Sequence, residues 1–174
     1  NLVNEAALLT ARRNEKVINM NAMGEAAERV VMGPERRSHI ISDAEKRLTA
    51  YHETGHALIG LLEDKMSSVH KVTIIPRGRA GGYTLSIPKE DRAYSTKSEM
   101  LADLEMFLGG RVAEALVLKD ISSGASSDLE RATHLARRMV CEYGMSDKLG
   151  SMTFGHPDGQ VFLGRDITRE RNYS

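Results

Sequence analysis

The sequence predicts a mainly α-helical protein that carries one small antiparallel β hairpin. Long stretches have apolar residues at helical spacing, and several of them begin with a Ser or Thr capping pattern. Only two short runs are rich in β-branched or alternating apolar residues. With 174 residues, 41% of them apolar, the chain is long enough to bury one sizeable core. We therefore expect one compact domain and at most a fragment of a second.

Two amphipathic helices are predicted at the start of the chain. Apolar residues recur at positions 2, 6 and 9 and predict a helix over residues 2–14. A second helix is predicted over residues 22–32, and Gly33-Pro34 ends it. The first seven residues already resemble the interior of a helix, so we expect the chain to be a piece of a longer protein.

The middle of the sequence predicts a long helix followed by the hairpin. Ser42 with Glu45 three residues later forms a capping-box pattern, and the helix is expected to run to about Leu62. Residues 69–75 are rich in β-branched side chains, whereas residues 83–87 alternate between apolar and polar. We expect these two strands to pair, joined by a glycine-rich loop.

The second half of the sequence predicts two further helices. One begins with the capping pattern of Thr96 and Glu99 and runs to about residue 118. Gly109 and Gly110 interrupt it at a cost of roughly 1 kcal/mol each, which close packing against another helix would explain. The last helix is predicted to begin with the capping pair Ser127 and Glu130 and to end near Gly144.

Composition excludes several classes of function. Lysine plus arginine and aspartate plus glutamate each number 24, so no basic field favours nucleic acid as a partner. No apolar run approaches the roughly 18 residues that span a bilayer, and the start lacks the layout of a signal peptide. The single Cys141 cannot form an internal disulfide and is expected to be a buried thiol in a reducing, cytosolic compartment.

One motif indicates metal-dependent hydrolysis. His52 and His56 lie four residues apart, so on a helix both imidazoles face the same side and can bind one tetrahedral cation. Glu53 lies beside that face. Its carboxylate can take a proton from metal-bound water, whose pKa zinc lowers to roughly 7, and deliver it to the leaving amine. Gly55 is a poor helix former, so we expect it to make room for a neighbour.

The third metal ligand cannot be chosen from spacing. A catalytic zinc ion takes three protein ligands, and the third is usually a histidine or a carboxylate. Glu114 and Asp128 are the leading candidates, and Asp120 and His134 stand behind them. An acidic residue such as Asp128 also suits the first turn of a helix without any metal, and Glu114 also suits a hydrogen bond to a ligand histidine. Residue patterns leave this choice open.

Residues 50–57, AYHETGHA, resemble the FtsH family of membrane-anchored, ATP-dependent zinc metalloproteases. Further segments that resemble the family follow in order along nearly the whole chain: residues 1–9, 32–36, 108–111 and 124–129. The resemblance implies that Asp128 completes the zinc site with His52 and His56, that Glu53 is the catalytic base, and that Glu114 is a nearby supporting group. Thr54 and Ala115 depart from the usual family residues, but neither is an expected ligand or base.

The resemblance also implies how the chain is organised and what it does. Residues 1–33 would be the end of an ATPase lid and its connector, and residues 34–174 the zinc metalloprotease domain. The whole protein would be a homohexamer at the cytoplasmic face of the bacterial cell membrane that degrades unfolded, misassembled or short-lived proteins. No phosphate-binding glycine loop with its lysine is present, so ATP would bind to an ATPase domain outside this sequence.

Substrate binding and two alternative functions complete the predictions. Either predicted strand, residues 69–75 or 83–87, offers an edge to an extended peptide, although an ordinary hairpin packed on the helices is equally consistent with the pattern. One alternative is a non-catalytic hexamerisation module with a vestigial metal site. The other is a metal enzyme that hydrolyses small amides instead of proteins.

Overall fold

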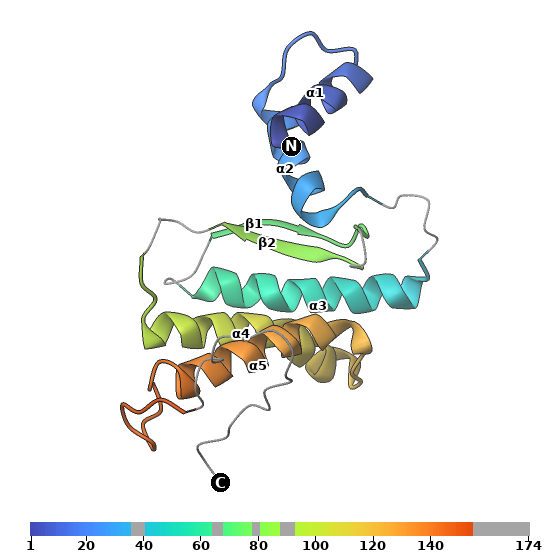
Figure 1. Cartoon of the computed structure of the whole chain (residues 1–174). Coiled ribbons are helices and arrows are strands. Elements are labelled where there is room, and N and C mark those ends of the chain that lie inside the picture. The colour runs from blue at the N-terminus through green and yellow to red at the C-terminus, as the bar shows by residue number, and fades with distance from the viewer. Residues whose placement is uncertain (36–40, 64–67, 78–80, 88–92, 155–174) are drawn as a thin grey trace, which may run out of the picture.

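The computed structural model describes residues 1–35, 41–63, 68–77, 81–87 and 93–154. It is mainly helical with one two-stranded antiparallel sheet, so the predicted fold class is confirmed (Figure 1). No helix within the described ranges is both long and apolar enough to cross a membrane. The elements, in chain order, are α1 (Leu2–Arg12), α2 (Met20–Met32), α3 (Asp43–Leu62), β1 (Ser68–Thr73), β2 (Tyr83–Ile87), α4 (Lys97–Ala113), the π-helix η1 (Glu114–Leu118), the 3-10 turn η2 (Ser123–Ala125) and α5 (Ser126–Cys141).

Helices α1 and α2 form a hairpin that stands on the sheet side of the molecule (Figure 1). Its small core consists of Ala6, Leu9 and Ala26, with Met23 packed against them. The side chain of Asn19 caps α2 by accepting a hydrogen bond from the backbone N–H of Ala22, which explains why this helix begins two residues before its predicted start.

The rest of the chain is layered, with the sheet on α3, α3 on α4, and α4 on α5 (Figure 1). The predicted hairpin is confirmed: β1 pairs antiparallel with β2, and a bulge lies between Val69 and Lys71. Strand β1 ends at Thr73, short of the predicted Ile75, and the Thr73 hydroxyl accepts a hydrogen bond from the backbone N–H of Ile75. The predicted glycine loop falls partly on residues 78–80, which lie outside the described residues.

Glycines allow α3 and α4 to approach closely. A Cβ atom added to Gly55 would lie 2.3 Å from the carbonyl oxygen of Gly109, and one added to Gly109 would lie 2.8 Å from the carbonyl oxygen of Gly55. Real Cβ atoms do not come that near to a backbone, so each helix needs glycine where the other crosses it. The expectations that Gly55 makes room for a neighbour and that the glycine pair allows close helix packing are both confirmed.

The helix caps were predicted with mixed success. Both hydrogen bonds of the Thr96–Glu99 capping box are present at the start of α4: each side chain accepts from the backbone N–H of the other residue. At the start of α3, the Ser42 side chain accepts a hydrogen bond from the backbone N–H of Glu45. The predicted cap at Ser127 is wrong, because η2 runs directly into α5 and the helix begins at Ser126 without a side-chain cap. Cys141, at the end of α5, is half-buried and not buried as expected.

Candidate metal centre

Helix α3 presents His52 and His56 on its buried face. The two residues lie one helical turn apart, and each is only 8% exposed. Their rings pack edge to face with centroids 4.7 Å apart, and their Nε2 atoms lie 3.0 Å from one another. A Cβ atom on Gly110 of α4 would lie 2.6 Å from both rings, so that glycine leaves the space in which the imidazoles fit.

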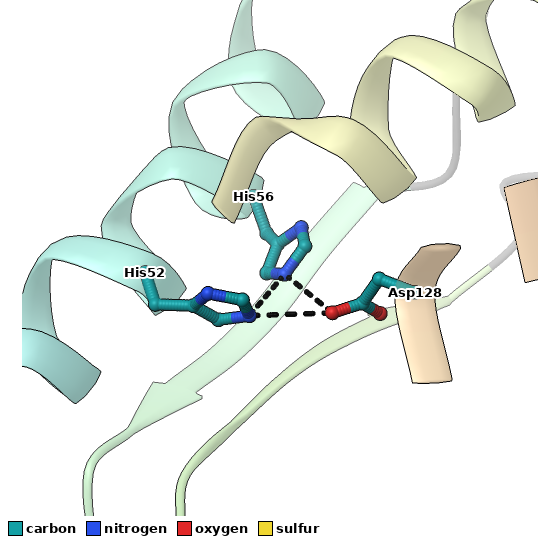
Figure 2. Close-up of side chains that lie close together, drawn as sticks. All are labelled: His52, His56 and Asp128. Carbon is teal, nitrogen blue, oxygen red and sulfur yellow. Dashed lines mark hydrogen bonds and ion pairs between the residues drawn. The ribbon is translucent and has the colours of Figure 1, made fainter. Parts of the chain in front are cut away.

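Asp128 joins the two histidines from the first turn of α5 (Figure 2). Its Oδ2 atom lies 3.2 Å from His52 Nε2 and 3.4 Å from His56 Nε2. Within the described ranges, these three residues are the group of histidine, cysteine and acidic side chains whose donor atoms converge closely enough for one metal ion. The choice between carboxylates that sequence spacing left open thus has a clear geometric outcome: Asp128 faces the Nε2 atoms and Glu114 does not.

The opposite ring nitrogens are already engaged. His52 Nδ1 lies 2.7 Å from Glu114 Oε1, and His56 Nδ1 lies 2.7 Å from the backbone carbonyl oxygen of Met106. A carbonyl oxygen only accepts hydrogen bonds, so the Nδ1 of His56 must donate, and the Glu114 carboxylate favours the same tautomer for His52. When both rings are neutral, as metal binding requires, their Nε2 lone pairs therefore face the space beside Asp128.

Glu114 is a fully buried carboxylate whose oxygens are both bonded. It is 0% exposed and lies at the start of the π-helix η1, where a widened helical turn follows α4. Its Oε2 accepts from the backbone N–H of Ser122, and its Oε1 accepts from the Ser122 hydroxyl and faces His52. Burial raises the pKa of Glu114, but these hydrogen bonds outweigh it and hold the pKa below its usual value. Glu114 therefore stays charged and orients the imidazole of His52.

Glu53 follows His52 on α3 and is 6% exposed. The hydroxyl of Thr84 in β2 lies 2.8 Å from Glu53 Oε2 and 3.1 Å from the backbone oxygen of Glu53. Burial is the largest influence and raises the pKa of this carboxyl, while the hydrogen bond from Thr84 acts in the opposite direction. A carboxylate with a raised pKa beside a histidine pair is suited to exchange protons near neutral pH.

The charges of the centre act on one another strongly. The hydrogen bond that protonated His52 donates to Asp128 is the main influence that raises the pKa of His52, and burial opposes it. Burial also raises the pKa of Asp128, but hydrogen bonds from both histidines outweigh it and hold that pKa well below its usual range. Asp128 is therefore a carboxylate at neutral pH, as a metal ligand must be.

Two lesser candidates lie elsewhere, and three contacts were not foreseen. Asp120 is exposed and bonds the backbone N–H of Ile121, and His134 is exposed on α5; neither belongs to the converging group. Sequence patterns did not identify the carbonyl of Met106 or the hydroxyls of Ser122 and Thr84 as contacts of this centre. A backbone carbonyl has no sequence signal, and a single Ser or Thr in a loop or strand carries a weak one.

Comparison with known proteins places this chain in a family. Residues 39–174 match peptidase family M41. Over all 174 residues the chain is 59% identical to the ATP-dependent zinc metalloprotease FtsH of Veillonella parvula and 60% identical to that named FtsH 1 of a Thermoanaerobacter species. It is 53% identical over 175 aligned residues to the FtsH of Bacillus subtilis. The chain spans 27% of the length of the Veillonella protein and 28% of each of the other two. The match across most of its length, with the resemblance already seen at residues 50–57, shows that the chain belongs to peptidase family M41.

Proposed function

We propose that this chain is the proteolytic domain of an ATP-dependent zinc metalloendopeptidase, in which His52, His56 and Asp128 hold the zinc ion and Glu53 is the catalytic base. One observation carries the proposal: three donor atoms from α3 and α5 converge while the outer nitrogen of each histidine is already bonded. The names of the similar FtsH proteins support zinc as the metal and ATP dependence of the whole protein.

The donor set fits a tetrahedral zinc ion. Zinc bonds of about 2.0–2.2 Å place tetrahedral ligand atoms roughly 3.3–3.6 Å apart. The three donor atoms lie 3.0, 3.2 and 3.4 Å from one another, so a small outward adjustment of the two imidazoles would complete the match. Two neutral imidazoles and one carboxylate leave the fourth position open, as a catalytic zinc site requires.

The residues around the metal have separable tasks in peptide hydrolysis. Zinc, when bound, acts as a Lewis acid and lowers the pKa of a water molecule to about 7. Glu53 takes the proton of the attacking water and passes it to the leaving nitrogen, for which a raised pKa is favourable. Glu114 holds the ring of His52, and the Met106 carbonyl holds that of His56.

The organisation of the whole protein is part of the proposal. Residues 1–33, with α1 and α2, would be the end of the ATPase lid and its connector, and residues 34–174 the protease domain. The full protein would form a homohexamer that is anchored in the bacterial membrane and degrades unfolded polypeptides on the cytoplasmic face. Large apolar side chains left exposed on α3 are consistent with further packing partners: Leu58, Leu61 and Leu62.

We also propose that one strand of the sheet pairs with the backbone of the substrate. In the described part of the chain the sheet has two strands, so each has an edge free for a third. Strand β2 reaches the proposed base, because its Thr84 contacts Glu53. A structure with a bound peptide that makes no main-chain hydrogen bonds to β1 or β2 would rule this out.

Metal analysis of the full-length protein tests the proposed function. We expect about one zinc ion per chain in the parent and none in Asp128→Ala, whereas Glu114→Gln should keep zinc but bind it about 10–100-fold more weakly. Retention of zinc with parental affinity by Asp128→Ala would remove Asp128 as a ligand. A parent that takes up no zinc even after reconstitution would favour the non-catalytic hexamerisation module.

A further inference from the structure

Strand β2 approaches the helix of the proposed base directly. The hydroxyl oxygen of Thr84 lies 2.8 Å from Glu53 Oε2, a length typical of a hydroxyl that donates to a carboxylate. The same oxygen lies 3.1 Å from the backbone oxygen of Glu53. A hydroxyl has one proton to donate, so the shorter contact with the charged oxygen takes it.

The position of this hydroxyl is set by the backbone. A Cβ atom on Gly82 would lie 2.6 Å from the carbonyl oxygen of Thr73 and 3.1 Å from Glu53 Cγ, so the chain has no room for a side chain where it enters β2. Thr84 follows two residues later within the paired strand, where it is opposite Val72 of β1. Its short, β-branched side chain has few rotamers with which to move the hydroxyl away.

A hydrogen bond at one carboxylate oxygen has a specific consequence for the other. It restricts rotation of the Glu53 carboxylate and occupies Oε2, which leaves Oε1 to receive a proton. The contact also supplies a donor to a carboxylate that is 6% exposed and has lost most of its hydration. In the described residues, Thr84 is the side chain that donates to Glu53.

We propose that Thr84 is a positioning residue that holds the Glu53 carboxylate in the orientation required for proton transfer. This proposal rests on the proposed role of Glu53 as the base. It assigns to β2 a task in catalysis that is separate from any contact of the strand with substrate.

Two substitutions separate the hydroxyl from the shape of the side chain. Thr84→Val keeps the branched shape and the strand preference but removes the donor, whereas Thr84→Ser keeps the donor and removes a methyl group. If the hydroxyl positions the base, Thr84→Val should lose hydrolytic activity and Thr84→Ser should keep most of it. If Thr84 only packs the strand on α3, Ser should be the worse variant.

The kinetic test uses the full-length protein and measures kcat and KM for hydrolysis of an unfolded protein, together with zinc content. Thr84→Val should lower kcat by about tenfold or more with KM and zinc content unchanged, while Thr84→Ser should keep most of kcat. Thr133→Val is the matched control, because in the described part of the chain the exposed Thr133 hydroxyl donates to the backbone oxygen of Leu129 within α5, and it should leave kcat unchanged.

A binding test adds a readout that does not depend on turnover. A peptidyl hydroxamate binds metal and also donates a hydrogen bond to the base, whereas a thiol analogue of the same peptide binds metal alone. Thr84→Val should weaken hydroxamate binding by about fivefold or more and leave the affinity for the thiol unchanged. Equal losses for both ligands would overturn the positioning role.

A double variant separates this proposal from the proposed function. In a Glu53→Gln background, Thr84→Val should cause no further loss of kcat, since residues that act through one group are not additive. If Glu53→Gln loses hydrolysis as expected while Thr84→Val keeps the parental kcat, the role of Thr84 is overturned and the role of Glu53 stands. A parental rate in Glu53→Gln would overturn both proposals.

Discussion

Two clusters of charged side chains in this molecule differ in how their charges are balanced. At the junction of α2 with the sheet, Glu28 accepts hydrogen bonds from Lys71, Arg77 and Tyr83, and Arg77 also donates to Glu35. Two carboxylates thus face two permanent cations. At the metal centre, the carboxylates of Asp128, Glu114 and Glu53 face two histidines, and within the described ranges no lysine or arginine pairs with them.

This difference supports a structural role for the junction and the proposed chemical role for the metal centre. Buried carboxylates without cations are costly, so a protein retains such a set where a bound cation completes it. The junction needs no ligand, because Arg77 is 2% exposed and its guanidinium donates to Glu28, to Glu35 and to the backbone oxygen of Gly33. The metal centre has excess negative charge and converging lone pairs, so its stability should depend on the metal, whereas that of the junction should not.

Removal of the proposed base should have the largest effect on the function of the metal centre. Glu53→Gln preserves the shape of the side chain but cannot take a proton, so hydrolysis of unfolded protein should fall by about 10²–10⁴-fold. Zinc content, measured by elemental analysis, should stay at the parental level, because Glu53 is not a proposed ligand. Glu63→Gln, at the C-cap of α3, is a control that should keep the parental rate.

Arg77→Met should have the largest effect on stability. It removes the buried cation that pairs with both Glu28 and Glu35 and should lower the free energy of unfolding by about 3 kcal/mol. Denaturant titration measures this loss, and zinc content of the folded protein should not change. Arg138→Met, which breaks an exposed pair with Glu142, should cost less than about 1 kcal/mol. A loss of zinc in Arg77→Met would contradict the separation of the two clusters.

Gly110→Ala tests how tightly the centre is packed. The added Cβ would lie 2.6 Å from both imidazoles, so the rings must move, and we expect a stability loss of about 1–3 kcal/mol with weakened zinc binding. Gly24→Ala in α2 is the matched control, because nothing lies within 4 Å of its Cβ position and alanine should stabilise the helix by up to about 1 kcal/mol. Thermal unfolding with and without zinc distinguishes the two effects. Zinc affinity equal to that of the parent would contradict the close fit.

The smallest expected effect is the pH dependence of the junction. Burial raises the pKa of Glu28, but hydrogen bonds from Lys71 and Tyr83 outweigh it, and the folded pKa lies below the usual glutamate value of 4.5. The charged form therefore stabilises the fold above pH 4.5, and this contribution is lost as pH falls from 4.5 through the lower folded value. The difference in unfolding free energy between the parent and Glu28→Gln should shrink over that window. A difference independent of pH would show that Glu28 is not stabilised as an ion.

Local features were largely predictable from the sequence. Helical periodicity and capping patterns located α3 and α4, and their predicted ends at Leu62 and Leu118 agree with the end of α3 and with the end of η1 after α4. The cap at Ser127 was mispredicted because the preceding turn, η2, already continues into α5. Capping patterns describe a helix start only when the chain enters from an extended conformation.

The sequence by itself determined the pairing of His52 with His56, because four-residue spacing on a helix places both rings on one face whatever the rest of the chain does. Only the tertiary structure decided which carboxylate faces which nitrogen. Glu114 and Asp128 lie 62 and 76 residues from His52, and their positions depend on how α4 and η1 pack on α3 and how α5 packs on α4. The same is true of Thr84 and Glu53, which come together only because β2 packs on α3 without an intervening side chain at Gly82. Periodicity is a local property of the chain, whereas the convergence of donor atoms depends on contacts between distant segments.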